Sequence, residues 1–148
     1  MSDSLELSKA YTSRDRAAMG GFKRIMGNST AWHTQEFGFW VIMRAAKVKG
    51  RDQVTFHYTK PQTDGANTEV TLTLPERAMV LGHCHTHPHS IKTGNFSTGD
   101  KRGFEKLAKA RSGIAYYLLN GASEIRRAIT AAEFPAGVVV NWEQGVTP

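Results

Sequence analysis

Four histidines occupy alternate positions in one short stretch of the chain, at His83, His85, His87 and His89. Alternate side chains of a β-strand point to the same face of a sheet, so His85 and His87 can reach the same ion. Imidazole is a good ligand for Zn²⁺, at a distance of about 2.0–2.1 Å. Cys84 lies between two of the histidines and points to the opposite face in this register, so it is not counted as a ligand. The spacing therefore predicts a metal site on one face of a strand.

A third ligand is predicted at Asp100, which follows a loop that can fold back toward the histidines. Asp100 falls in the first turn of a predicted helix, where the helix dipole favours a carboxylate. Two histidines and one carboxylate leave a fourth tetrahedral position open, as in catalytic zinc sites. Zinc lowers the pKa of a water in that position to about 7. We therefore expect one catalytic Zn²⁺ per chain, held by His85, His87 and Asp100.

Two further residues are candidates for the chemistry around this water. Glu36 stands just ahead of a strongly apolar run and is the candidate general base. Ser97 lies three residues before Asp100, and its hydroxyl could donate to a developing oxyanion. Simpler interpretations stay open for both. Ser97 and Asp100 nearly match a helix capping box, and Glu36 alone is more often a solvated acid at the end of a strand.

The other histidines are assigned lesser roles. His83 and His89 are expected to line the cleft or face solvent rather than to bind the metal. His33 and His57 are taken as ordinary polar positions. A structural zinc finger is excluded, because one cysteine and crowded histidines do not give two separated pairs of ligands.

The elements that must position these residues follow from hydrophobic periodicity. A helix is predicted from Leu5 to Met26, with Gly20-Gly21 as a point that favours a break. A second helix is predicted from the Ser97–Asp100 stretch to Arg111. The predicted strands cover residues 36–43, 54–58, 69–74, 78–87, 114–119 and 124–129, with a short one at 138–140. Asn120-Gly121 is typical of a hairpin turn. The pattern predicts an α/β or α+β sandwich with a mixed, mostly antiparallel sheet flanked by helices.

The 148 residues suit one domain. We expect an N-terminal helical segment over 1–30, a catalytic core over 31–130 and a C-terminal strand and tail over 131–148. The sequence contains no run of eighteen apolar residues, so no membrane span is predicted. The start of the chain is acidic and polar, unlike a secretory signal. A single cysteine excludes an internal disulfide and fits a reducing compartment, so a cytoplasmic location in the producing cell is expected.

The net charge of +6 favours acidic partners in a general way, including nucleic acid. The basic residues are scattered, however, and are better explained as solvated faces. No interleaving of aromatic and basic residues supports a nucleic-acid surface. A nuclease or nucleic-acid-binding domain therefore stays as an alternative that rests on charge alone.

Taken in order, these residues resemble the motif of the JAMM (JAB1/MPN/Mov34) zinc metallopeptidases. That motif has a Glu at the start of an early strand, then His-x-His-Pro, then Ser-x-x-Asp. Here the parts are Glu36, His85-Thr86-His87-Pro88 and Ser97-Thr98-Gly99-Asp100. The resemblance implies a cytidine-deaminase-like sandwich and hydrolysis of a peptide or isopeptide amide. It implies the same zinc ligands, with Glu36 moving the proton and Ser97 holding the oxyanion.

The loop between His87 and Ser97 holds nine residues, more than the common pattern. With Phe96 ahead of Ser97, it resembles an uncharacterised bacterial branch of JAMM-like domains found in Rhs and other polymorphic-toxin proteins. This implies an effector domain that a secretion system can deliver to another cell, with an immunity protein or an Rhs carrier as partner. The implied substrates are a protein tail, a conjugated ubiquitin-like modifier or the peptides of peptidoglycan. An inactive JAMM-like scaffold is a further alternative, against which the complete ligand set argues.

Overall fold

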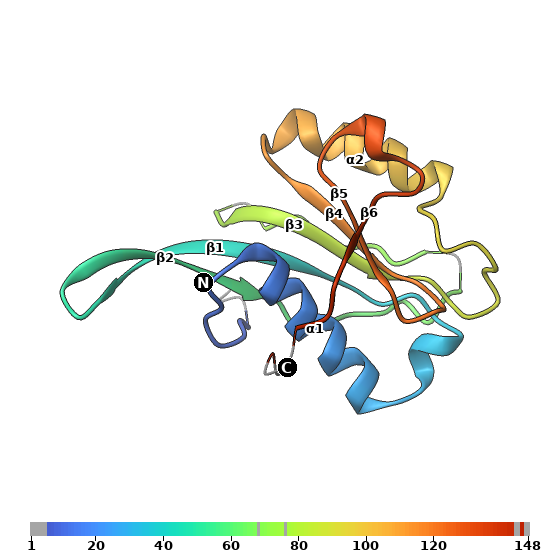
Figure 1. The fold of residues 1–148 in the computed structure, drawn as a ribbon, viewed down its shortest axis with the longest axis horizontal. Coiled ribbons are helices and arrows are strands. Elements are labelled where there is room, and N and C mark those ends of the chain that lie inside the picture. The colour runs from blue at the N-terminus through green and yellow to red at the C-terminus, as the bar shows by residue number, and fades with distance from the viewer. Residues whose placement is uncertain (1–5, 68, 76, 144–145, 147–148) are drawn as a thin grey trace.

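The computed structural model describes residues 6–67, 69–75, 77–143 and 146. Two α-helices, six strands and two short 3₁₀-helices follow one another along the chain (Figure 1). The order is α1 (Arg14–Asn28), η1 (Ala31–His33), β1 (Gly38–Val48), β2 (Arg51–Tyr58), β3 (Met79–Thr86), α2 (Thr98–Ala110), β4 (Ala115–Leu119), β5 (Ile125–Ala128), η2 (Ala131–Glu133) and β6 (Val138–Val140). Neither helix is long and apolar enough to cross a membrane, within the described ranges.

The six strands form one sheet in the order β2-β1-β3-β4-β5-β6. Only β3 and β4 run parallel, and α2 makes the crossover between them; every other neighbouring pair is antiparallel. The prediction of a mixed, mostly antiparallel sheet in an α+β protein is therefore confirmed. A β-bulge interrupts the β1–β3 pairing after Val41, and Leu81 is the extra residue on β3.

The two helices cover opposite faces of the sheet. The α1 face carries a core that includes Phe22 of α1, Phe39 and Cys84, while the α2 face carries one that includes Trp40 and Phe104 of α2. Cys84 is fully buried on the α1 side, so the prediction that it points away from the alternating histidines is confirmed. The histidine face of β3 is thus the face that α2 covers.

The first helix is shorter than predicted. Residues 6–13 are not helical, and α1 begins only after its cap, Ser13. Tyr11 forms a β-bridge with Phe56 of β2, and Leu7 forms one with Thr59, the residue after β2. Gly20 and Gly21 do not break the helix. They let α1 pack closely against the rest of the protein, because a Cβ at Gly20 would lie 2.2 Å from the hydroxyl of Tyr11 and one at Gly21 only 2.4 Å from the ring of Phe39. Glycine here serves packing rather than a break.

The predicted strand over residues 69–74 is wrong. This segment is extended but joins no sheet, and it crosses the α2 face instead. The indole nitrogen of Trp40 donates to the carbonyl of Thr73 at 3.1 Å, and Leu72 and Leu74 pack against the core of that face. Its alternating pattern therefore reflects a segment with one buried side, a condition that strand pairing shares.

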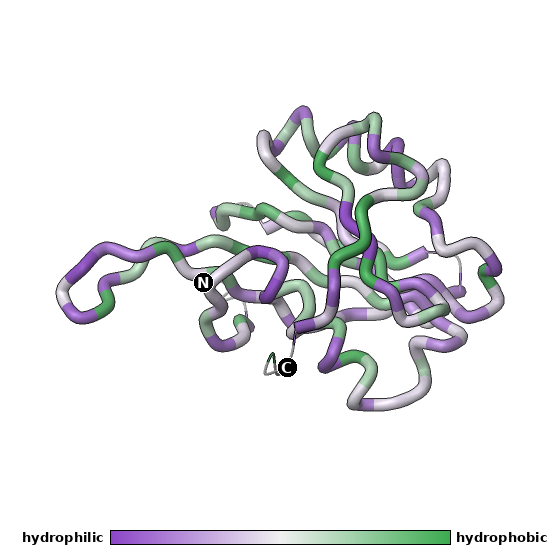
Figure 2. Tube along the Cα trace, in the orientation of Figure 1, coloured by the Kyte–Doolittle hydropathy of each residue, from purple (hydrophilic) through white to green (hydrophobic). Residues whose placement is uncertain are grey.

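Strands β1 and β2 continue beyond the body as a two-stranded arm, which projects on the left of Figure 1. Lys49 and Gly50 both have positive φ and form the tip, in place of the broader turn predicted over Lys49–Asp52. Figure 2 shows that the end of the arm is mainly hydrophilic, and residues 47–54 are exposed. The predicted hairpin turn at Asn120-Gly121 is longer in the structure, since β5 begins only at Ile125.

Candidate metal centre

Strand β3 presents two of the alternating histidines on the α2 face. Its register with β4 pairs His83 with Tyr116 and His85 with Leu118. The strand ends at Thr86, but the backbone N–H of His87 still donates to the carbonyl of Leu119 at 3.0 Å. His87 therefore keeps the strand alternation for one more residue, and its side chain stays on the same face as that of His85.

A capping box fixes the start of α2 and the position of Asp100. The Ser97 hydroxyl accepts from the backbone N–H of Asp100 at 3.0 Å, and Oδ2 of Asp100 accepts from the N–H of Ser97 at 2.8 Å. Both residues thus play the capping role that the sequence left open. For Asp100 this role is also what aims the carboxylate, because both of its oxygens face histidines of β3.

The ring nitrogens and the carboxylate converge on one point. Nε2 of His85 lies 3.1 Å from Oδ1 of Asp100, and Nε2 of His87 lies 3.2 Å from Oδ2. One ligand atom from each of the three residues lies within 4.8 Å of the other two. Both histidines are buried and Asp100 is nearly so. These three residues could hold a metal ion.

The hydrogen bonding of the two imidazoles is incomplete without a ligand. Among the described residues, Nδ1 of His85 and Nδ1 of His87 are buried and have no hydrogen-bond partner, while Nε2 of His85 faces the Asp100 carboxylate 3.1 Å away. A metal ion between the imidazoles and the carboxylate would bind both Nε2 atoms without taking a partner from any other described residue. The rings are held by packing instead of a second hydrogen bond: the His85 ring lies 5.1 Å from that of His87 and 6.2 Å from Phe96.

The charges of the cluster are strongly coupled. Burial alone would raise the pKa of Asp100, but the neighbouring His85 and His87 and the Ser97 N–H hold it well below its usual range. Burial has the largest single effect on the pKa of His85 and lowers it, but the charge and hydrogen bond of Asp100 together with the charge of Glu36 outweigh burial and raise the pKa. For His87 burial prevails and lowers the pKa. The carboxylate is therefore ionised at any ordinary pH, as a metal ligand must be.

Glu36 lies beside this group but outside it. Thr86 aligns the segment that carries Glu36 with β3. The N–H of Thr86 donates to the carbonyl of Phe37, and the Phe37 N–H donates to the Thr86 hydroxyl, each at 2.9 Å. Because Gly38 pairs with His85, Glu36 falls opposite His87 on the same face. Its side chain is 8% exposed, and burial raises its pKa to about 7. Glu36 is thus placed near the cluster without being one of its three candidate ligands.

Two residues near Glu36 escaped the sequence analysis. Glu69 is close enough for its charge to raise the pKa of Glu36 further. It was assigned to a strand, and nothing in its spacing relates it to the histidines. Thr86 was passed over between the histidines, although it is fully buried and aligns Glu36. A polar residue at an inward position of an apolar strand is the signal that could have found it.

The outer two histidines have different surroundings. His83 lies between aromatic rings, stacked on Tyr116 at 4.3 Å and edge-on to Trp40 at 5.1 Å. Burial, with the neighbouring His85, lowers the pKa of His83 to about 3, so it is neutral. It forms an aromatic wall next to His85. His89 lies past Pro88, is exposed, and stacks on His33 at 3.9 Å. The structure therefore does not bring His89 into the group.

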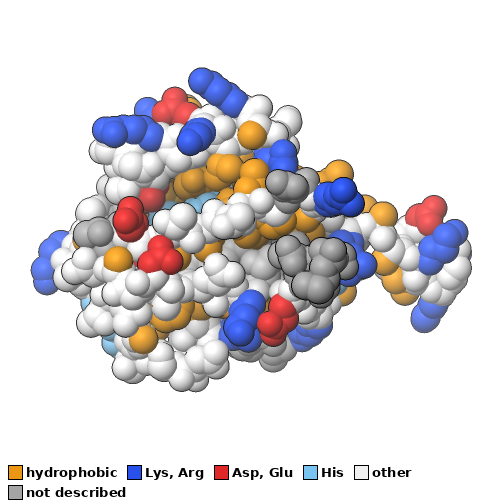
Figure 3. All heavy atoms as spheres, turned by 180° about the vertical axis from the view of Figure 1, so that it is seen from behind, with side chains coloured by type: hydrophobic (Ala, Val, Ile, Leu, Met, Phe, Trp, Pro, Cys, Tyr) orange, Lys and Arg blue, Asp and Glu red, His pale blue; other side chains and the backbone are white. Residues whose placement is uncertain are grey.

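The surface around the site is mixed in character. Figure 3 shows exposed histidine atoms beside an apolar band, and Lys and Arg side chains at the top of this view. The partly buried apolar residues that pack against the core on this face are Leu7, Leu72, Leu74, Ala78, Leu107, Ala108 and Ala131. The α2 face, which carries the candidate centre, is therefore partly apolar.

Comparison with known proteins gives no relative. No protein-family model, curated protein or solved structure matches the chain. We therefore infer the function from the residues and their geometry.

Proposed function

We propose that the protein is a zinc-dependent hydrolase that cleaves a peptide or isopeptide amide. The observation that carries the proposal is the convergence of His85, His87 and Asp100 within 4.8 Å, with Glu36 on the same face but outside the group. Two imidazoles and a carboxylate are a donor set that suits Zn²⁺ and leaves a coordination position open. Zinc held there would lower the pKa of a water to about 7.

Glu36 and Ser97 then carry out the proton transfers and stabilise the oxyanion. Glu36 accepts a proton from the attacking water, whose oxygen forms a bond to the carbonyl carbon of the amide. The Ser97 hydroxyl uses its oxygen for the cap, which leaves its proton to donate to the oxyanion. Glu36 passes the proton to the amide nitrogen, the C–N bond breaks, and the products are a carboxylic acid and an amine.

Two parts of the proposal have different support. A hydrolytic metal centre is supported by the donor set, its burial and the placement of Glu36. The choice of an amide substrate is supported by the resemblance to the JAMM motif alone. The two parts therefore need separate tests.

Zinc content tests the metal centre. Purified protein should bind about one zinc per chain, measured by mass spectrometry of the metal after dialysis. His85→Ala and His87→Ala should each lose it, since two ligands rarely hold zinc. His89→Ala is the matched control, because this exposed histidine lies outside the group, and it should keep the metal. Wild-type protein that binds no zinc would leave the inactive scaffold as the better interpretation.

Glu36→Gln tests the base. This variant should keep one zinc per chain but lose hydrolysis, because the amide cannot accept a proton. A library of peptides and purified peptidoglycan fragments serves as substrate, and new amino groups are counted by mass spectrometry. The base assignment is wrong if zinc-loaded Glu36→Gln cleaves as fast as the wild type.

A further inference from the structure

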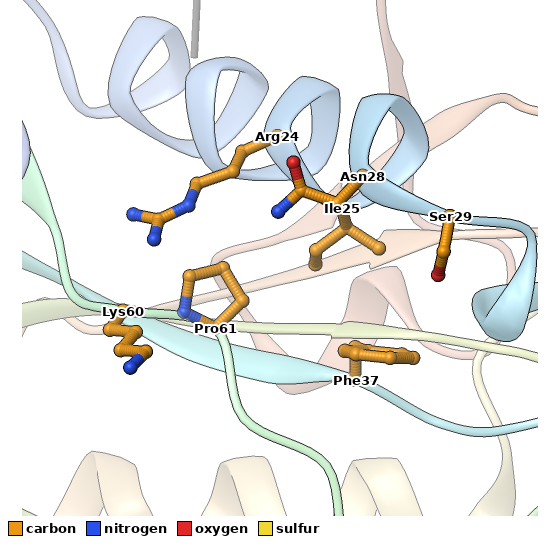
Figure 4. A pocket seen from close by; sticks show the side chains of 7 residues that line it. All are labelled: Arg24, Ile25, Asn28, Ser29, Phe37, Lys60 and Pro61. Atoms are coloured by element: carbon orange, nitrogen blue, oxygen red, sulfur yellow. The ribbon is translucent and has the colours of Figure 1, made fainter.

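A small pocket lies on the other side of the molecule from the metal centre. It has a volume of about 120 Å³ and lies between the second half of α1 and the chain at Lys60-Pro61. Figure 4 shows its lining side chains: Arg24, Ile25, Asn28, Ser29, Phe37, Lys60 and Pro61. Phe37 packs with the α1-side core, whereas its neighbour Glu36 faces the other way. The pocket is therefore separated from His85 and His87 by the thickness of the sheet.

The lining combines two cations with an apolar floor. The guanidinium of Arg24 extends from α1 on the side of the pocket near Lys60 and Pro61, whereas the side chain of Lys60 points away from α1 (Figure 4). Ile25, Phe37 and Pro61 supply apolar surface. The lining contains no acidic residue within the described part of the chain. A ligand that fits must be anionic at one end and apolar beside it.

The two cations are largely free to bind an anion. Arg24 is half-buried and forms no ion pair or hydrogen bond with any residue that the structure describes. Lys60 has one competitor, Glu6, whose carboxylate is 4.0 Å away in a pair with both side chains mostly exposed. Such a pair is weak, so a ligand can displace it. A half-buried guanidinium without a partner is a ready site for a carboxylate, which it can bind through two parallel hydrogen bonds.

We propose that this pocket binds a carboxylate carried by a small apolar group. Two sources share this chemistry: the C-terminal residue of a peptide that ends in an apolar side chain, and a free small carboxylic acid. Arg24 holds the carboxylate, the exposed Lys60 adds positive charge nearby, and the apolar group packs on Ile25, Phe37 and Pro61. The pocket uses none of the candidate metal ligands, so this proposal stands or falls independently of the proposed function.

Binding is tested by NMR titration of the ¹⁵N-labelled full chain with N-acetyl-leucine. Its signals should shift around Ile25 and Phe37 and saturate. N-acetyl-leucinamide, which has the same side chain without the charge, should bind at least about tenfold more weakly, because charge-assisted hydrogen bonds are lost. The acid 4-methylpentanoate distinguishes the sources. Tighter binding of N-acetyl-leucine supports a peptide C-terminus, and tighter binding of the simple acid supports a free carboxylic acid.

Matched variants test the two cations. Arg24→Gln should weaken N-acetyl-leucine about tenfold. Lys60→Gln should weaken it less, about two- to fivefold, because Lys60 is exposed. Glu6→Gln removes the competitor and should tighten binding slightly. Arg44→Gln, an exposed arginine on the arm, should leave the affinity unchanged.

Three results would overturn the proposal. The first is equal binding of N-acetyl-leucine and its amide, and the second is unchanged affinity in Arg24→Gln. The third is saturable binding of inorganic phosphate as tight as that of N-acetyl-leucine, which would show that the apolar floor is irrelevant. Each titration is repeated in His85→Ala with a chelator present. The shifts at Ile25 and Phe37 should persist there, which separates this pocket from any carboxylate bound at the metal centre.

Discussion

Two capping boxes in this molecule have the same local chemistry and different surroundings. At α2, Ser97 and Asp100 exchange hydrogen bonds; at η2, Thr130 and Glu133 do the same, with Glu133 accepting from the Thr130 N–H at 3.2 Å and from the Ile129 N–H at 2.8 Å. Asp100 also lies 3.1 and 3.2 Å from two imidazoles. No ion pair joins Glu133 to a described histidine.

A carboxylate in a helix capping box can also take part in a metal site, but the capping box alone does not create one. In both boxes one carboxylate satisfies backbone N–H groups at the start of a helix. Only the box at α2 is packed against a strand that carries histidines on the facing side. The function proposed for Asp100 therefore comes from β3, while its orientation comes from the cap. Variants at the two boxes separate these contributions.

The largest effect is expected on zinc affinity. Asp100→Asn removes one of three ligands and should lower the affinity for zinc by more than about 100-fold, beyond the usual effect of losing an outer-shell partner. Glu133→Gln should leave the affinity unchanged. Competition with a fluorescent zinc chelator measures both. Equal affinities in the two variants would remove the distinction between the boxes.

Stability in zinc should follow the same division. Free zinc at 100 times its Kd should stabilise the wild type and Glu133→Gln by about 2.7 kcal/mol over the chelated protein. Asp100→Asn should gain far less at that zinc concentration. Urea unfolding with and without a chelator gives both values. A gain in Asp100→Asn that matches the wild type would place the bound zinc elsewhere.

Substitutions at Ser97 separate the cap from the proposed role in hydrolysis. Ser97→Ala should cost about 1 kcal/mol of unfolding free energy, and Ser97→Gly only a few tenths, because glycine tolerates the cap position. Both variants remove the hydroxyl, so both should slow hydrolysis equally. Thermal unfolding and the peptide assay are run side by side. If activity followed stability across the two variants, the hydroxyl would act only as a cap.

The smallest effect is a pH dependence of the metal-free protein. The depressed pKa of Asp100 stabilises the fold above about pH 3.9, and this contribution is lost as pH falls. The raised pKa of His85 stabilises it fully below about pH 6.5, and this contribution is lost as pH rises through the folded-state pKa. The stability advantage of wild type over Asp100→Asn should thus be larger at pH 5.5 than at pH 8. Urea unfolding in chelator tests this, with Glu133→Gln as control; an equal advantage at both pH values would contradict it.

The sheet and the candidate centre were the most predictable parts. Alternation around His85 identified a strand, its face and the opposite orientation of Cys84, because the period of a strand is a local property. The cap at Ser97 was also readable, since capping depends on residues three apart. The meeting of Asp100 with the histidines was predicted from the order of the motif, but the geometry that brings them together depends on the crossover from β3 through α2.

Other features could not be derived from local patterns. Residues 69–74 alternate like a strand, but no neighbouring strand accepts them. Gly20-Gly21 weakened the predicted helix, yet the contacts with Tyr11 and Phe39 that explain it come from distant parts of the chain. The pocket at Arg24 and Lys60 joins residues that are 36 positions apart, and no local pattern relates them. Periodicity describes which face is buried, not what covers it.

The most direct test of the metal centre is a crystal soaked in zinc, with anomalous diffraction measured on both sides of the zinc absorption edge. The account predicts one strong peak about 2.0–2.2 Å from Nε2 of His85, Nε2 of His87 and a carboxylate oxygen of Asp100, with an open position toward Glu36. A peak at another location, such as the stacked pair His33 and His89, or none at the three predicted ligands, would contradict it.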